Sequence, residues 1–430
     1  MKPLAFLNAR LAEPESGYDG PGCVVVADGV IADVRRQARI DDLADDVRVV
    51  DCDGALLIPG LIDIRVKTGE PGAEPKETLK SASRAAAAGG VTTVVVQPDT
   101  DPAIDDPASV DFVLRRGRDI GLANVVPAGA LTRGCRGERM AEIGLMKEAG
   151  AAYFTDAERV ITDTRLLQRL MSYAGAFDAV VSCRPDDPWL TAGAVATAGE
   201  FASLLGLPAA PAAAERIGLE RDLALAELTG VRLLVDQIST AGALEAFRRA
   251  VARGVRATAS ASINHLTFNE LDVGDYRTFY RLTPPLRSED DRRALIEAVA
   301  DGTVAIVTSA HAPAPAEDKR LPFAEAAPGA VGLETLLPGL LRLFHDGSVD
   351  LLTLLRTVTT APADLLGLPG GRIAPGAPAD LALVDLGAPW RVDAETLASK
   401  SKNSPFDGRL LQGRVLLTLK DGRVVHRAEG

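Results

Sequence analysis

The sequence contains few of the side chains that bind transition metals. Of its 430 residues, only four are histidines and four are cysteines. These eight residues are scattered along the chain, at His265, His311, His345, His426, Cys23, Cys52, Cys135 and Cys183. No two cysteines form a CxxC pair. This spacing argues against a disulfide framework and against a zinc site made of thiolates, and it predicts reduced cysteines that pack in the interior.

Long apolar runs and an excess of basic charge are also missing. No apolar stretch approaches the roughly 20 residues of a membrane span, and the first residues lack one long enough for a signal peptide. The 47 basic and 59 acidic side chains give a formal net charge of −12, so we expect no basic surface for a phosphate backbone. The sequence therefore predicts a cytoplasmic protein that binds neither membranes nor nucleic acid.

The composition is that of a globular protein, with 47% hydrophobic and 25% charged residues. Short apolar runs alternate with longer, alanine-rich amphipathic stretches, a pattern typical of buried parallel strands and their covering helices. Eight strands are predicted, at residues 61–67, 92–96, 124–128, 151–155, 179–183, 232–236, 256–260 and 304–309. Helices are predicted between them, for example at residues 78–88, 139–149, 163–176, 241–253 and 289–300. Eight such units over about 250 residues predict an α/β fold, a (β/α)8 barrel.

The two ends of the chain follow a different pattern, with short strand-like segments separated by turn residues. We expect residues 1–58 and 370–430 to form one small composite β-sandwich domain and residues 59–369 to form the barrel. The proline- and glycine-rich segment 368–378 is the predicted linker between them. Two loops rich in proline and alanine, 208–214 and 313–327, are expected on the face where barrel enzymes hold their chemistry.

Several motifs resemble those of dihydroorotases within the amidohydrolase superfamily. They are PGLIDIRVKTGEPGAEPKET, AAAAGGVTTVVVQPDT, STAGALEAFRRAVARG, LTPPLRSEDDRRALIEAVADGT, APADLLGLPGGRIAPGAPADLALVDL and SKNSPFDG, and together they span nearly the whole chain. The resemblance implies a metal-dependent barrel with a composite β-sandwich. It also implies hydrolysis of a cyclic amide by water bound to one or two zinc ions. Such a centre needs about three His, Asp or Cys ligands and an open position for water.

The chain departs from this family at most of the metal-binding positions that the resemblance implies. Those positions hold Arg65, Lys67, Asp156, Arg184, Gln237 and Ala310. Arg65 and Lys67 replace a His-x-His pair, and Ala310 replaces an aspartate that serves as ligand and general base. Only Asp156 keeps a ligand side chain. Residues 151–155 contain no lysine for a carbamylated bridging ligand, since Lys147 falls on the preceding predicted helix. We therefore expect no catalytic metal and no other cofactor.

The positions that would bind the substrate carboxylate differ as well. The resemblance implies an arginine where the chain has Gly69 and an asparagine where it has Asp99. An aspartate at that place would repel an anionic substrate. The sequence therefore predicts that no catalytic residues remain.

Two interpretations of Arg65, Lys67 and Arg184 remain open. They could form a new anion pocket at the barrel mouth, or they could pair with Asp63, Asp99, Asp156 or Asp186 and fill the old site, which we favour because buried cations need partners. His265 and His311 are interpreted as hydrogen-bonded remnants. Cys183 is interpreted as a packing residue rather than an activated thiolate, because no suitably spaced histidine supports a nucleophile pair.

Three functions from different classes follow from these residues. The first, which we favour, is a non-catalytic dihydroorotase homologue in a homo- or hetero-oligomer. The resemblance suggests its partner, because inactive dihydroorotase-like chains associate with aspartate transcarbamoylase in pyrimidine biosynthesis. The second is an active cyclic amidohydrolase with a rebuilt site. The third is a sensor that binds a small anion through Arg65, Lys67 and Arg184.

Overall fold

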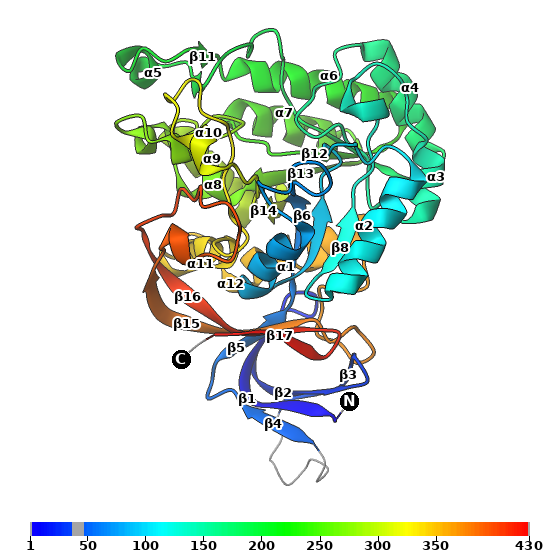
Figure 1. Ribbon diagram of the computed structural model, residues 1–430, viewed down its shortest axis with the longest axis vertical. Helices are drawn as coiled ribbons and strands as arrows, with labels where there is room; N and C mark the ends of the chain where they lie inside the picture. The colour runs from blue at the N-terminus through cyan, green and yellow to red at the C-terminus, as the bar shows by residue number, and fades with distance from the viewer. Residues whose placement is uncertain (1, 37–46, 429–430) are drawn as a thin grey trace.

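The computed structural model describes residues 2–36 and 47–428. An α/β barrel with its surrounding helices forms the larger part, and a β-sheet that carries both chain ends lies against it (Figure 1). The predicted fold class is confirmed. Within the described ranges, no helix has the length and apolar character needed to cross a membrane.

The barrel contains two parallel sheets joined by isolated bridges. The first sheet contains β6 (Leu61–Val66), β7 (Val91–Val96) and β8 (Asn124–Pro127). The second contains β9 (Val180–Cys183), β12 (Arg232–Val235), β13 (Ala257–Ser262) and β14 (Val304–Thr308). Phe154 bridges Gly129 and Val181 on one side, and His311 bridges Val66 on the other, so the circle closes.

The fourth predicted strand, residues 151–155, lies between its expected neighbours but forms only one isolated bridge to each of them, through Phe154. Backbone hydrogen bonds of Ala152, Tyr153 and Thr155 continue the pairing on the β8 side. The chain then bends at Ala157, which has a φ of 53°. The other seven predicted strands are present within one or two residues of their expected ends.

Helices cover the outside of the barrel. The larger ones are α1 (Leu79–Ala88), α2 (Pro107–Ile120), α3 (Ile143–Ala149), α4 (Thr164–Gly175), α6 (Ala213–Thr229), α7 (Ala241–Ala252), α9 (Glu289–Ala300), α11 (Leu336–His345), α12 (Leu351–Thr357) and α13 (Thr360–Leu366). Shorter ones lie in the loops, at α5 (Glu200–Leu204), α8 (Ile263–Thr267) and α10 (Ala316–Lys319). The predicted loop 208–214 therefore ends in the first turn of α6, and the predicted loop 313–327 contains α10.

Local chemistry explains where several of these helices begin. Thr78, Asp163, Thr240 and Ser288 each accept a backbone N–H of the following turn through a side-chain oxygen. Such caps satisfy donors that a helix start leaves free and contribute about 1 kcal/mol each. The starts of these four helices are thus fixed by a short sequence signal.

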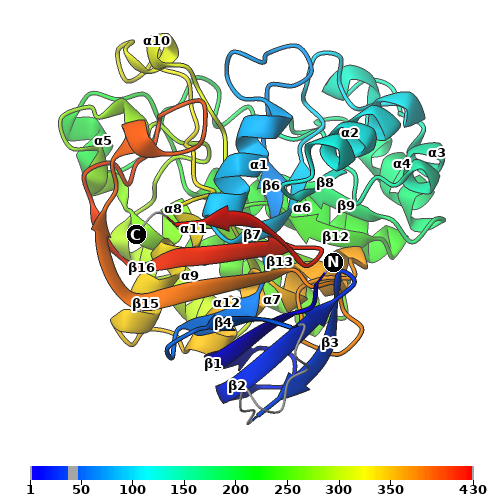
Figure 2. The same ribbon diagram turned by 60° about the horizontal axis from the view of Figure 1, so that its bottom comes forward.

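Both ends of the chain join in one eight-stranded sheet. Its order is β17-β16-β15-β5-β1-β2-β3, and β4 pairs with β1. The strands are β1 (Leu4–Glu13), β2 (Tyr18–Ala27), β3 (Val30–Arg35), β4 (Arg48–Asp51), β5 (Leu56–Pro59), β15 (Leu381–Arg391), β16 (Leu410–Lys420) and β17 (Arg423–Arg427). Figure 2 shows the blue N-terminal strands beside the orange and red C-terminal ones. The proposed boundaries at 58/59 and 369/370 stay predictions, and residues 1, 37–46 and 429–430 lie outside the described residues.

An apolar cluster formed by alternate barrel-strand residues underlies the site. Ile62 and Ile64 of β6 pack with Val95, Leu234 and Ile306 of other strands, and all are nearly inaccessible. Apolar layers of this kind fill a barrel and leave no pore. Polar side chains gather beyond them, where the strands end.

Candidate functional site

The carboxyl ends of the barrel strands bring most of the predicted site positions together. Arg65 lies near the end of β6 with Lys67 just after it, Arg184 follows β9, and Gln237 follows β12. Ala310 follows β14 and, with Arg65, Lys67 and Gln237, lines one cavity. This end of a barrel is where enzymes of the fold hold their chemistry. Four of the six predicted metal positions therefore line one cavity, whereas Arg184 lines a neighbouring cavity and Asp156 lines neither.

Arg65 fills the centre of this site. Its side chain is only 2% exposed, its Nε donates to Asp236 Oδ2 at 2.7 Å, and its Nη2 donates to Glu158 Oε1 at 2.7 Å. With its oxygen turned towards Arg65, the Gln237 side-chain amide lies 2.7–3.0 Å from the guanidinium nitrogens. Burial opposes the charged form of Arg65, but the carboxylates of Asp236 and Glu158 outweigh it and raise the pKa. The buried guanidinium is thus held by carboxylates.

Glu158 connects three cations. Besides Arg65, it accepts from Arg184 Nη1 at 2.6 Å and lies 3.1 Å from Lys67 Nζ. Burial opposes ionisation, yet Lys67, Arg65 and Arg184 together hold the pKa of Glu158 well below its ordinary value. We call Arg65, Lys67, Arg184, Glu158 and Asp236 the mouth cluster.

The sequence suggested four aspartates as partners of the three cations. Two of these aspartates do form ion pairs with them. Lys67 Nζ lies 2.7 Å from Asp99 Oδ2, and Arg184 Nη2 lies 3.5 Å from Asp186 Oδ2.

The suggestion is wrong for the other two aspartates, which bond to uncharged groups. Asp63 accepts the backbone N–H groups of Arg65 and Ser309, and no cationic side chain among the described residues forms an ion pair with it. Asp156 accepts the backbone N–H of Thr132 at 2.9 Å and also the Thr132 hydroxyl. Both carboxylates fix local backbone instead of neutralising the mouth cations.

The two main carboxylates of the mouth cluster, Glu158 and Asp236, were missed by sequence reasoning. Asp236 directly follows the apolar run of β12, and Glu158 follows the fourth predicted strand by three residues. A carboxylate just past a buried parallel strand is the signal that could have found them. Pairing across the barrel, between residues 171 positions apart, is not visible in the sequence.

The residues present do not fit a zinc centre. Arg65 occupies the first ligand position with a guanidinium that is already bound, and Ala310 offers no donor atom. The one retained ligand side chain, Asp156, is engaged by Thr132. Within residues 2–36 and 47–428, no three His, Cys, Asp or Glu side chains come together as a metal site would require.

Of the two positions implied for substrate binding, Gly69 has no room for a side chain and Asp99 carries a negative charge. A Cβ atom at Gly69 would lie 1.9 Å from the carbonyl oxygen of Ala73, so no larger side chain fits without a backbone shift. The loop is held there by the Gly69 N–H, which donates to the Glu77 carbonyl at 2.8 Å. Asp99 is bound to Lys67. An arginine–asparagine grip on a carboxylate is therefore absent at these two positions.

The two remaining histidine candidates are buried and hydrogen-bonded in place, and Cys183 is partly buried. His311 is inaccessible, accepts from the Gly332 N–H through Nδ1 at 3.2 Å, and has Nε2 3.5 Å from Glu77 Oε2. His265 donates to Pro284 O, and burial lowers its pKa to about 4, so it is neutral at pH 7. Burial also raises the pKa of the Cys183 thiol well above its ordinary value. These contacts agree with the packing interpretations.

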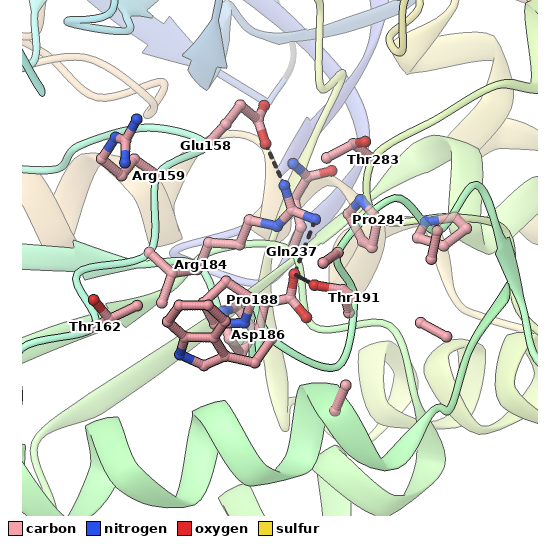
Figure 3. Close-up of a pocket in the computed structure, with 18 of the residues that line it drawn as sticks. Glu158, Arg159, Thr162, Arg184, Asp186, Pro188, Thr191, Gln237, Thr283 and Pro284 are labelled. Atoms are coloured by element: carbon pink, nitrogen blue, oxygen red, sulfur yellow. Dashed lines mark hydrogen bonds and ion pairs between the residues drawn. The ribbon is translucent and has the colours of Figure 1, made fainter. Parts of the chain in front are cut away.

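Two cavities flank the mouth cluster and share Glu158, Gln237 and Thr283 as a common wall. The cavity of about 460 Å³, here the Lys67 cavity, has three basic and four acidic lining side chains. The cavity of about 690 Å³, here the Arg159 cavity, has four arginines and two carboxylates. Figure 3 shows Arg184 in the Arg159 cavity, reaching Glu158 on one side and Asp186 on the other. The two cavities thus differ in charge.

Comparison with known proteins first defines the class. The structure superimposes on "L-Hydantoinase (Dihydropyrimidinase) from Arthrobacter aurescens" with a TM-score of 0.87 at 24% identity, covering 99% of this chain and 96% of the other. It also superimposes on dihydropyrimidinase from Brevibacillus agri with a TM-score of 0.84 at 20% identity, covering 99% and 95%. Residues 328–426 match the model described as "Amidohydrolase family". The fold is that of the amidohydrolase barrels.

Sequence relatives narrow the class further. Residues 54–243 match the model described as "Dihydro-orotase-like". The chain is 41% identical to a protein named dihydroorotase from Anaeromyxobacter dehalogenans, covering 100% of this chain and 99% of that one. It is 39% identical to a dihydroorotase from Syntrophotalea carbinolica, covering 99% of each. The chain belongs to the dihydroorotase family.

Proposed function

We propose that this chain is a non-catalytic member of the dihydroorotase family and acts as a structural or regulatory partner of aspartate transcarbamoylase in the cytoplasm. The observation that carries the first part is the buried Arg65, ion-paired to Asp236 and Glu158 where the family resemblance implies the first metal ligand. Zinc bound there would have to displace the Arg65 guanidinium from both carboxylates and leave that buried cation without a partner.

The charge of the Lys67 cavity supports the same conclusion. Its lining carries more acidic than basic side chains, and Lys67 already binds Asp99 and Glu158. An anionic substrate such as dihydroorotate would have to displace one of these carboxylates. For the same reason we do not favour the anion-sensor interpretation of Arg65, Lys67 and Arg184, because each cation is already matched by carboxylates.

The barrel scaffold keeps motifs that resemble those of the family. In the PPLR motif, Arg287 is buried against Glu215 at 3.0 Å. In the SKNSPFDG motif, the Asn403 side-chain amide donates to Ala312 O and Gly329 O and so fixes the loops beside the barrel mouth. Family motifs persist where they hold shape and are lost where they would supply chemistry. A partner role needs only the shape.

A second candidate is an active cyclic amidohydrolase with a rebuilt site. It is favoured by one observation, the 41% identity to a protein named dihydroorotase across the whole chain. Such an enzyme would need an activated water or nucleophile supplied by groups outside the six family positions.

The partner role is tested by mixing the purified chain with aspartate transcarbamoylase from the same organism. Molar mass is measured by light scattering, and transcarbamoylase rate and thermal stability are followed in the same samples. We expect a joint species with an altered rate or a raised melting temperature. The control replaces this chain by an unrelated protein of similar mass. Separate elution with an unchanged rate and melting temperature would remove this partner.

A further inference from the structure

The Arg159 cavity holds two arginines that the mouth cluster does not use. Of its four arginines, Arg184 binds Glu158 and Arg287 binds Glu215. Arg136 and Arg159 form no ion pair with any described residue, and both side chains are exposed. Figure 3 shows Arg159 on the far side of Glu158 from Gln237, with no bond drawn to it. These two guanidinium groups therefore form no salt bridge with a described carboxylate, in a protein with a net charge of −12.

Backbone geometry places these two arginines on the same part of the rim. Gly137 follows Arg136 with a φ of 73°, and its ideal Cβ position lies 3.5 Å from Arg159 Cδ. Asp156, a buried carboxylate of this region, accepts the Thr132 N–H at 2.9 Å. Burial raises the pKa of Asp156 and the charge of Arg159 opposes that rise, but the two side chains form no salt bridge. An anion bound at this part of the rim would be attracted by both guanidinium groups.

An exposed tryptophan lines the same cavity. Trp189 is 82% exposed, although tryptophan is usually well buried. The other tryptophan of the chain, Trp390, lies in β15 of the sheet, with Nε1 donating to Gly413 O. An indole face at the rim of a cavity can cover the flat or apolar body of a ligand. The volume of about 690 Å³ is in the range of small-molecule sites.

We propose that the Arg159 cavity binds a small organic dianion, with its acid groups on Arg136 and Arg159 and its carbon skeleton against Trp189. This site goes beyond the proposed function and does not depend on it, because Arg136, Arg159 and Trp189 belong neither to the mouth cluster nor to the family's metal positions. It also differs from the Arg65, Lys67 and Arg184 anion pocket, whose cations are already paired. The unpaired charges, the cavity and the exposed indole occur together only here among the described cavities.

The test is a titration of the full-length chain with phthalate, an aromatic dicarboxylate, at low ionic strength. Binding is measured by calorimetry and by the fluorescence of Trp189 in a Trp390→Phe background. Benzamide serves as the neutral probe and pyrophosphate as the inorganic polyanion. The double variant Arg136→Gln/Arg159→Gln removes the charges, and Arg118→Gln is the matched control, an exposed arginine on α2 away from the cavity.

We expect saturable phthalate binding that weakens with salt, no benzamide binding, and a loss of affinity of about tenfold or more in the double variant. Arg118→Gln should bind as the parent does. Absence of saturable binding by both phthalate and pyrophosphate, or binding that is unchanged in the double variant, would overturn the proposal. Tighter binding of pyrophosphate than of phthalate would overturn the contact with Trp189. Circular dichroism melts establish that each variant is folded.

Discussion

Two buried arginines, Arg65 and Arg287, each form an ion pair with a glutamate, but the two pairs differ in their surroundings. Both are less than a tenth exposed, and both donate to a glutamate, Glu158 and Glu215 respectively, at 2.7 and 3.0 Å. Arg287 lies in a motif that follows the family resemblance. Arg65 lies at a position that departs from it.

Their surroundings differ. Glu215 is nearly inaccessible, and Arg287 is its sole cationic partner among the described residues. The other donors to Glu215 are the backbone N–H groups of Ser239 and Thr240 and their hydroxyls. Glu158 is about one-third exposed and bonds to three cations. The Arg287 pair is thus a closed structural link, whereas the mouth cluster is a redundant network at the barrel mouth.

The largest expected effect is on Arg287. In Arg287→Met, Glu215 remains buried without a compensating charge, so we expect a loss of about 3–5 kcal/mol in the free energy of unfolding, measured in urea. Arg292→Met is the matched control, because its partner Glu289 is about one-third exposed, and it should lose less than about 1 kcal/mol. Equal losses in the two variants would contradict the structural role of the Arg287 pair.

Arg65→Met should destabilise the chain less than Arg287→Met does. Glu158 keeps Lys67 and Arg184 when Arg65 is removed, and only Asp236 loses its cation. We expect a loss of about 2 kcal/mol, measured in the same urea experiment. A loss equal to or larger than that of Arg287→Met would show that the mouth cluster is not redundant.

The ionisation of Glu158 gives the mouth cluster a pH dependence. Because its pKa is lower in the folded chain than its ordinary value of 4.5, its contribution to stability is present above about pH 4.5 and is lost as the pH falls through the folded pKa. Glu158→Gln should therefore be less stable than the parent at neutral pH, and the difference should shrink in acid. Urea unfolding between about pH 7 and pH 3 measures it. A constant difference would contradict the ion-paired state of Glu158.

Two residues at the barrel mouth have a backbone conformation that their side chains do not favour. Ala310 has a φ of 51° and Gln237 a φ of 60°, both in the left-handed region. Ala310→Gly should stabilise the chain by about 0.5–1 kcal/mol, because glycine adopts this conformation without the Cβ penalty. Ala312→Gly, a neighbour without a positive φ, is the control and should not stabilise. Thermal melts that rank the two variants in the opposite order would refute the strain at Ala310.

The smallest expected effect is that of restoring two histidines on the turnover of dihydroorotate. The double variant Arg65→His/Lys67→His should show no turnover of dihydroorotate in either direction, even with added zinc. Gln237 and Ala310 do not replace the missing ligands, and the Ala73 carbonyl closes the space at Gly69. Measurable turnover would show that the other ligand positions are wrongly placed.

Much of the fold was accessible from the sequence because buried parallel strands and capped helices leave local signals. Seven strands and the joining of both chain ends followed from such patterns. The fourth segment also lies where it was expected, although only Phe154 forms a bridge with both neighbours.

The site could be predicted from the sequence only in part. The six family positions could be placed because motifs fix them, and Asp99 and Asp186 could be suggested as partners. Glu158 and Asp236 could not, because the direction of a side chain across a barrel depends on strand register. The approach of Ala73 to Gly69 likewise exists only in three dimensions.

The most direct test of the central claim is to measure zinc content and dihydroorotate turnover on the same sample of purified protein, with the relative from Anaeromyxobacter dehalogenans assayed beside it as a control for the conditions. We expect clearly substoichiometric zinc and no ring opening or closure by this chain. One equivalent of tightly bound zinc, together with turnover that a chelator abolishes, would contradict the claim that the mouth cluster has replaced the metal centre.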